Sequence, residues 1–444
     1  MTPLTIFHAT ASGHRAVSKA VSLSRAAVPR CRLLLVLCAK LGASLCVAPS
    51  ALADAALPQG HLMDALRAVA ANHPSVSAAR GQEQAARLDL SGVETRRLPR
   101  PSIALTSRAG VTSAEARLTQ TLHDWGATSA RIDAARSQVG AAAARTDDTG
   151  RAVVLELLEQ WRQWAVARAR IASQDAALQR LARYEQSARA RGRAGFGSDA
   201  DVALVLGRVA QAGAEMASYR AAAAAAHAQL RALGFHSMLD PPMLPGTDSW
   251  PFASPLLPGR WLVRAEQDSP VLARLRSEAQ AADATARALQ ADRWPVINAV
   301  ASHQQVDGGA SSRLYLSVEY APGSWGGDAQ ATRAALARAD AARAALESAR
   351  IDLARGLQSE WTALSGLQQR LGGETAGVEA NRAVLQSFER QFEAGRKSWL
   401  DVLNAARELT AAEAAAAAVA LELAVGQVRL AVMIGLPSAT ELQP

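Results

Sequence analysis

The chain has 444 residues, a formal net charge of +8, three cysteines and an aromatic content of only 4%. The charge is unevenly spread, because six basic residues and no acid lie in residues 1–53, which leaves 42 basic and 40 acidic residues elsewhere, a net charge of +2. Cys31, Cys38 and Cys46 also lie in that segment. Nucleic-acid binding therefore loses its main support, the strongly basic balance, and the remainder has no thiols for disulfides or cysteine–metal sites.

Residues 1–53 have the pattern of a secretory signal peptide. A basic stretch up to Arg32 precedes an apolar run over 33–47 and the small-residue site 51–53. This order predicts cleavage after Ala53. The alternatives are a membrane anchor or a buried helix, but the apolar run is short for crossing a bilayer.

The next segments predict a helix followed by two strands. The helix is expected from Gly60 to Arg97, with Pro74 in the first turn of its main part, where a missing N–H costs nothing. Pro99 marks its end. Enrichment in Thr, Ser and Val with weak alternation over 102–122 then indicates two strands.

A very long helical hairpin follows. Residues 126–192 contain no proline and keep apolar residues at helical spacing, which predicts a helix of roughly 100 Å. The pattern breaks over 192–197, restarts after Ser198, a residue suited to helix capping, and continues to about Gly234. Six prolines within 237–259 mark a linker.

The second half repeats the first. Matching features recur at offsets of 196 or 200 residues: Pro74 with Pro270, Pro99 with Pro295, Trp125-Gly126 with Trp325-Gly326, and Gly-x-x-Ser-x-x-Asp-Val at 195–202 with the same motif at 395–402. A period this long indicates a duplicated half-molecule. The chain therefore divides into a signal peptide (1–53), a first repeat (54–236), the linker (237–259) and a second repeat (260–444).

The second half predicts clearer strands, from Pro295 to His303 and from Arg313 to Tyr320, with a loop over 307–312. In the second strand, one face carries Leu314, Leu316, Val318 and Tyr320, and the other carries Arg313, Tyr315, Ser317 and Glu319. A long helix over 327–394 and its return over 398–434 complete the half.

Four strands with one apolar face fit part of a transmembrane barrel. They cannot close one alone, since the smallest barrels have eight strands and an open edge in lipid is excluded. The chain is therefore expected to oligomerise. A helical span is not expected, because Glu413 and Glu422 interrupt the apolar stretch 411–425. The alternative is a small soluble sheet packed on the helices.

The duplication, the Pro-led strands, the Trp-Gly helix starts and the Gly-x-x-Ser-x-x-Asp-Val turns resemble the TolC-like outer-membrane efflux and secretion channels. The resemblance implies a mainly α fold with a small β part, in which tandem-duplicated helical hairpins form a periplasmic tunnel. Four strands per chain would complete a twelve-stranded barrel in a homotrimer, in the outer-membrane lipid of a Gram-negative bacterium. No cofactor, metal or enzymatic activity is implied.

The resemblance also implies partners and cargo. An inner-membrane ABC transporter and a periplasmic adaptor (a membrane fusion protein) would deliver cargo to the duct. Within the family the chain resembles components that export adenylate cyclase–haemolysin toxins, which implies type I secretion of a protein toxin. Small-molecule efflux is the alternative cargo. A soluble periplasmic coiled-coil adaptor is a second alternative, but no lipoyl-like β-domain is evident.

The resemblance finally implies a gate at the periplasmic tip, with turns at Gly195, Ser198, Gly395 and Ser398. Asp201 corresponds to the acid of a tip lock, and Lys397 and Phe392 stand where the family has an arginine and a tyrosine. Asp401 would contribute to an axial ring of three carboxylates, and Asn404 replaces the second acid of that pattern. The alternative for the charged residues is ordinary solvated charge, or for the two aspartates a favourable helix N-terminus.

Other motifs are uninformative. The histidines lack metal-ligand spacing and no P-loop is present. Trp161, Trp164 and Trp361 are predicted to be packing anchors between the long helices.

Overall fold

The computed structural model describes residues 62–108, 111–234, 257–306, 309–320 and 327–435. All of them belong to a compact unit that begins at Leu57. The predicted signal peptide and most of the predicted linker lie outside the described residues.

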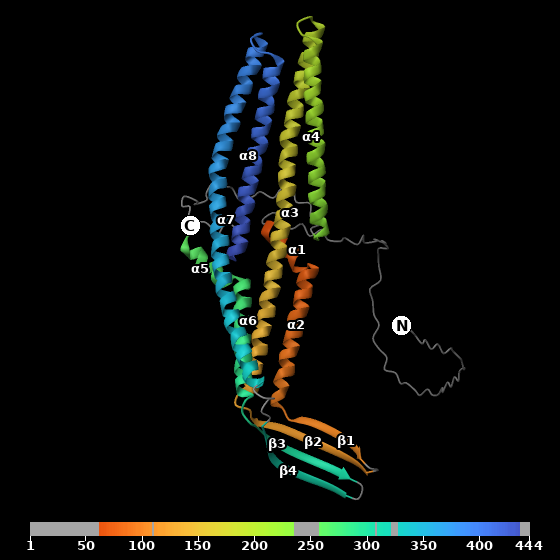
Figure 1. The fold of residues 1–444 in the computed structure, drawn as a ribbon. Helices are drawn as coiled ribbons and strands as arrows, with labels where there is room; N and C mark the ends of the chain where they lie inside the picture. Colours follow the sequence, from red (N-terminus) through yellow and green to blue (C-terminus); the bar gives the residue numbers. More distant parts are fainter. Residues whose placement is uncertain (1–61, 109–110, 235–256, 307–308, 321–326, 436–444) are drawn as a thin grey trace, which may run out of the picture. The chain divides into compact units, whose positions relative to one another are not determined.

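The two halves of the chain have the same order of elements (Figure 1). The first half consists of α1 (Leu62–Ala71), α2 (Pro74–Glu94), a 3₁₀ turn η1 (Thr95–Arg97), β1 (Arg100–Arg108), β2 (Val111–His123), α3 (Ala127–Arg193) and α4 (Asp199–Ala232). The second consists of α5 (Gly259–Asp268), α6 (Pro270–Ala291), β3 (Val296–Val306), β4 (Gly309–Glu319), α7 (Gly327–Glu393) and α8 (Trp399–Ile434). The mainly α fold with a small β part is confirmed.

Two predicted boundaries were wrong. The helix expected over 60–97 is divided into α1 and α2, because His73, which precedes Pro74, has the extended conformation that a following proline favours. Its side chain then caps α2 by accepting the N–H of Ser75. The loop expected over 307–312 is also too long, since β3 and β4 stay paired up to Val306 and Gly309. Gly309, Ser311 and Ser312 belong to the ladder instead.

The helices pack in the lateral order α2, α3, α6, α7 next to the strands. Both α3 and α7 have 67 residues, so each extends for roughly 100 Å. Near the strands α3 packs against α2 and α6, as in the bond from Thr146 to Glu83 of α2. Farther from the strands, α4 runs back along α3 and α8 runs back along α7. The hairpin turns therefore lie at the end of the helices opposite the sheet.

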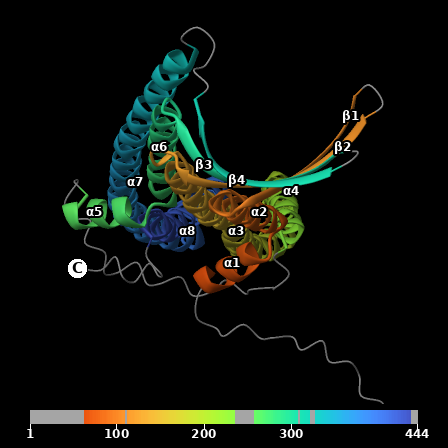
Figure 2. The ribbon, with the colours of Figure 1, turned by 90° about the horizontal axis from the view of Figure 1, so that it is seen from below.

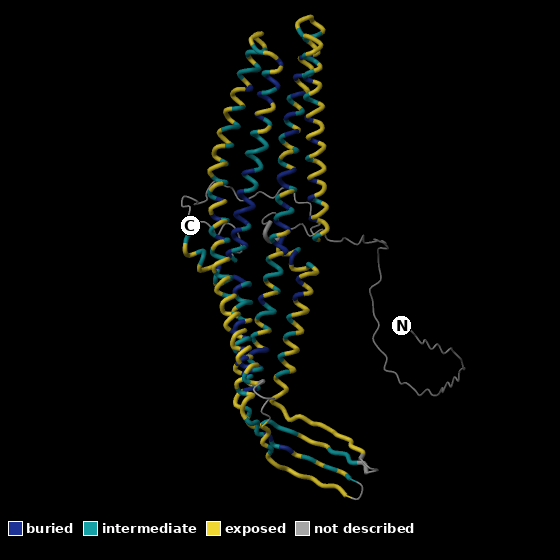
Figure 3. Tube along the Cα trace, viewed as in Figure 1, coloured by how far each residue is buried: buried dark blue, intermediate teal, exposed yellow. Residues whose placement is uncertain are grey.

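The larger of the two clusters of buried residues lies midway along the long helices (Figure 3). Trp161 of α3 and Trp361 of α7, 200 positions apart, are 0% and 1% exposed. Trp164 is partly buried against the same cluster. The prediction that these tryptophans anchor the packing of the long helices is confirmed.

Helix α8 is long and apolar enough to cross a membrane, with a mean hydropathy of 1.8 in its most apolar window. That window is 67% buried within the protein, against α7, α3 and α5. The apolar character of α8 is therefore used in the core.

The sheet has the order β1-β2-β3-β4 with every neighbouring pair antiparallel. Strands β2 and β3 join the two halves of the chain, and β1 and β4 are edges. Aligned residues share a face, so Pro101, Leu118, Ala301 and Leu314 lie together on one side. The predicted division of the last strand into an apolar and a polar face is confirmed.

Candidate functional site

Both long helices end in the same turn, built on Gly195 in the first hairpin and Gly395 in the second. Their φ angles are +79° and +71°, in the left-handed region that glycine enters without steric cost. The N–H after each glycine donates to the carbonyl five residues back, at 2.9 Å in the first hairpin and 2.8 Å in the second. This pattern is a Schellman motif, which satisfies carbonyls at the helix end.

The return helices both begin with a capping box. The N–H of Ser198 donates to Asp201 at 3.1 Å, and the N–H of Asp201 donates to the Ser198 hydroxyl at 3.2 Å. Ser398 and Asp401 repeat these bonds at 3.1 and 3.3 Å. The spacing Gly-x-x-Ser-x-x-Asp therefore encodes a helix end followed directly by a helix start.

Asp401 has further partners. The Ser398 hydroxyl donates to its Oδ2 at 2.8 Å, and the Lys397 ammonium lies 3.6 Å from its Oδ1. Hydrogen bonds from Ser398, helped by Lys397, lower the pKa of Asp401 below its ordinary value. Lys397 also lies 4.4 Å from the ring centre of Phe388. Within the chain, the ion pair of Lys397 is thus with Asp401, while Asp201 serves its own capping box.

Phe392 and Asn404 contact the other hairpin. The Arg191 guanidinium of α3 lies 4.5 Å from the centre of the Phe392 ring, which packs on Trp399 at 4.2 Å. Arg208 of α4 donates to the Asn404 amide oxygen at 3.2 Å. Phe392 and Asn404, two of the three residues that depart from the pattern of the resembled channels, therefore join the hairpins through an arginine in each case.

Sequence reasoning missed a polar seam between the hairpins several turns from the tips. The Tyr184 hydroxyl of α3 donates to Glu389 of α7, and Arg180 donates to Thr410 at 2.8 Å and to Glu413 at 3.3 Å, both on α8. Burial, followed by the bond to Glu389, raises the pKa of Tyr184. The spacing of four between Arg180 and Tyr184 marks one helix face, but nothing in the sequence names their partners.

The apolar face of the sheet forms a second candidate region, at the opposite end of the helices. Its large side chains are 44% to 81% exposed: Ile103, Leu105, Leu118, Leu314, Leu316 and Val318. The strands accordingly appear mostly exposed in Figure 3. A contiguous apolar surface of this kind marks contact with a membrane or a partner.

A strained corner connects this sheet to α3. Trp125, with φ of +56°, is the non-glycine residue that adopts positive φ among the described positions, and Gly126 follows at +88°. The Trp125 indole donates to the Pro295 carbonyl at 2.8 Å and lies 5.5 Å from the Trp294 ring. The Trp-Gly helix start predicted from the sequence is thus a tight turn, and a hydrogen bond to Pro295 connects it to the other half of the chain. Its counterpart at 325–326 lies outside the described residues.

Comparison with protein families decides the identity of the fold. Residues 64–234 and 261–436 match the model of the family described as outer membrane efflux protein. The chain belongs to the outer membrane efflux protein family.

Solved structures of other proteins have the same fold as this outer membrane efflux protein. The outer-membrane channel OprN has 21% identity and a TM-score of 0.72, over 84% of this chain and 89% of its own. CusC has 15% identity and a TM-score of 0.74, over 84% and 92%. VceC of Vibrio cholerae has 17% identity and a TM-score of 0.73, over 84% and 96%. A search of curated proteins gave no match.

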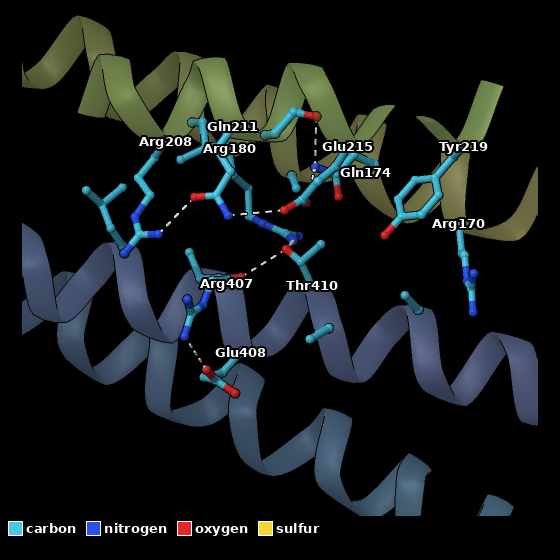
Figure 4. A pocket seen from close by; sticks show the side chains of 17 residues that line it. Arg170, Gln174, Arg180, Arg208, Gln211, Glu215, Tyr219, Arg407, Glu408 and Thr410 are labelled. Atoms are coloured by element: carbon cyan, nitrogen blue, oxygen red, sulfur yellow. Dashed lines mark hydrogen bonds and ion pairs between the residues drawn. The ribbon is translucent and has the colours of Figure 1, made fainter. Parts of the chain in front are cut away.

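In this outer membrane efflux protein, a cavity of about 480 Å³ lies between α3, α4 and α8 (Figure 4). Its charged residues are already engaged with neighbours. Arg407 pairs with Glu408 at 3.2 Å, and Arg170 stacks on Tyr219 at 5.8 Å. Gln174, 5% exposed, donates to the Ala212 carbonyl. The cavity therefore continues the polar seam between the hairpins. The described residues include no His, Cys, Asp and Glu cluster suited to a metal ion.

Proposed function

We propose that this protein is the outer-membrane exit duct of a tripartite export machine and that its cargo is a secreted protein. The observation that carries the proposal is the sheet, which has one exposed apolar face and two unpaired edges, β1 and β4. In lipid each unpaired backbone group costs several kcal/mol, so a sheet in a membrane must close on itself. Figure 2 shows the sheet bent into an arc, as a segment of a closed barrel would be.

The position of the apolar residues supports tilted strands. On β1 they lie around Ile103, which is aligned across the sheet with Ser312 of β4. On β4 they are centred on Leu316, which is four residues nearer to the helices than Ser312. Four residues along a strand are ~13 Å and three strand spacings are ~14 Å, which corresponds to a slope of roughly 43°. Strands of outer-membrane barrels tilt by about 35–45°.

Aromatic side chains at the helix-proximal end of the strands support a membrane boundary there. Trp125, Trp294 and Tyr320 are 51%, 58% and 60% exposed. Outer-membrane barrels carry girdles of such residues at the lipid–water interface. The helices then lie on the periplasmic side.

Oligomer formation is supported by the lateral borders of the helical part. Leu88 of α2 is 61% exposed, and Ile351 and Leu336 of α7 are 56% and 42% exposed. Because α2 and α7 are at opposite borders, neighbouring chains would cover both while β1 of one chain pairs with β4 of the next. Three chains would supply twelve strands, the number that the family resemblance implies.

The proposed partners are a periplasmic adaptor and an inner-membrane ABC transporter. The cargo assignment rests on the sequence resemblance to toxin exporters. Small-molecule efflux is the second candidate, favoured by the description of the matched family. The proposed periplasmic gate comprises Asp201, Phe392, Lys397, Asp401 and Asn404. It is supported by the contacts of these residues at the hairpin turns and by an Asp401 side chain that stays 39% exposed.

Two experiments test the function. The protein should fractionate with the outer membrane, run as heat-modifiable trimers on gels and form channels in planar bilayers. A water-soluble monomer would contradict the duct. Deletion of the gene should abolish export of one secreted protein without raising the accumulation of hydrophobic dyes. The reverse result would assign the duct to small-molecule efflux.

A further inference from the structure

The polar face of the sheet carries two arginines in one row across the strands. The register aligns Ser102 with Arg117, Arg117 with Ser302, and Ser302 with Arg313. Aligned residues share a face, so the four side chains form a line from β1 to β4. The arginines stand two strand spacings apart, about 10 Å, with one serine between them.

The two arginines differ in their ionic partners. Arg117 donates to Glu115 through Nε at 3.2 Å and through Nη2 at 2.8 Å. No described carboxylate forms an ion pair with Arg313. The remaining acid of the described strands is Glu319, three same-face positions from Arg313 at the end of β4. The row therefore holds one compensated and one uncompensated positive charge.

The row lies along a hollow of about 740 Å³ on the polar face. Besides the two arginines, the hollow is lined by the hydroxyls of Ser302, Ser311 and Tyr315, by the Gln304 amide and by the paired Glu115. The charge in this hollow that has no ionic partner is thus the Arg313 guanidinium, and further hydrogen-bond donors surround it. Such a lining attracts anions and repels cations.

We propose that Arg313, with Arg117 beside it, makes the membrane segment of the duct favour anionic over cationic solutes. The inference rests on the proposed function, in which this face lines the lumen and three copies arrange three arginine pairs around it. The effect depends on salt, because the Debye length is about 30 Å at 0.01 M and about 3 Å at 1 M. The proposed Asp401 carboxylates at the tip lie on the same conduction path and favour cations. The permeability ratio of each variant is therefore compared with that of the parent protein.

The test is the reversal potential of the full-length mature channel in planar bilayers under a KCl gradient at low ionic strength. Arg313→Gln lowers the Cl⁻/K⁺ permeability ratio, and the decrease shrinks as the salt approaches about 1 M. Glu115→Gln releases Arg117 from its partner and raises the same ratio. Arg313→Lys keeps the charge at the same position and leaves the ratio unchanged.

An unchanged ratio in Arg313→Gln channels overturns the proposal, and so does an equal decrease in Arg313→Lys. If Arg313→Gln forms no channels, Glu115→Gln decides, because an unchanged or lowered ratio there overturns the proposal as well. A parent protein that forms no channels contradicts the exit duct itself, so the two failures are distinguishable.

Discussion

The hydrogen bond from Tyr184 to Glu389 offers a direct way to loosen one hairpin from the other. Tyr184→Phe removes the hydroxyl and keeps the ring, whose centre lies 5.7 Å from that of Trp399. Tyr184 is 8% exposed and Glu389 is partly buried, so water replaces the donor that Glu389 loses only in part.

The magnitude follows from the charge on the acceptor. A hydrogen bond to an ionised group contributes about 1.5–3 kcal/mol. Since about 1.4 kcal/mol corresponds to a factor of ten, the equilibrium between joined and separated hairpins shifts roughly 10- to 100-fold toward separation. The Arg180 bonds and the apolar cluster around Leu403 remain, so the change is local.

The distance between two spin labels measures how far the hairpins separate. The chain has no cysteine after Cys46, so cysteines introduced at Asp199 and Arg396 report the distance between the two turns. Tyr184→Phe should broaden this distance distribution and lengthen its mean. The control is Tyr219→Phe, which removes a hydroxyl from a tyrosine stacked under Arg170 within the first hairpin. An unchanged distribution in Tyr184→Phe, or equal broadening in the control, would refute the reasoning.

Three further predictions concern the turn, the core and the exposed apolar face of the sheet. The folded pKa of Asp401 is lowered from 3.8, so its capping contribution is present above about pH 4 and is lost as the pH falls through the folded value; a spin label in the first turn of α8 should gain mobility only in that acidic range. Gly435→Ala should lower the thermal midpoint of the protein more than Gly395→Ala, because both have positive φ but an added Cβ meets Asp268 at 2.8 Å only in the former; left-handed strain alone costs about 1–2 kcal/mol, and equal midpoints would contradict this. Leu316→Arg should reduce membrane insertion, at a cost of about 2–4 kcal/mol near the bilayer midplane, whereas Ser317→Arg on the polar face should insert normally; equal insertion of both would reject the assignment of faces.

Local patterns in the sequence predicted the hairpin turns well. A Schellman glycine and a capping box each depend on residues within one turn of helix, so the motif around Gly395 and Ser398 carries its own structure. The contacts of Asn404 were not predictable in the same way. Its partner Arg208 lies 196 positions away in the chain, and their approach depends on how two hairpins supercoil.

Helix α8 and the ends of β3 and β4 show a second limit. Glu413 and Glu422 indicate that α8 is not a membrane span, but they do not show which elements bury its apolar residues. Ser311 and Ser312 suggested a loop, but pairing with Gln304 and His303 extends the strands. In both cases the deciding interactions come from another element.

The pairing of β2 with β3 has a consequence for assembly. The paired residues are between 174 and 193 positions apart, and the whole first hairpin of α3 and α4 lies between them in the chain. The centre of the sheet therefore closes only across a long stretch of chain. Until then each half carries a two-stranded ribbon that is marginal in water and exposes leucines such as Leu105 and Leu316. An incompletely folded chain therefore carries two aggregation-prone segments, one in each half, until the sheet closes.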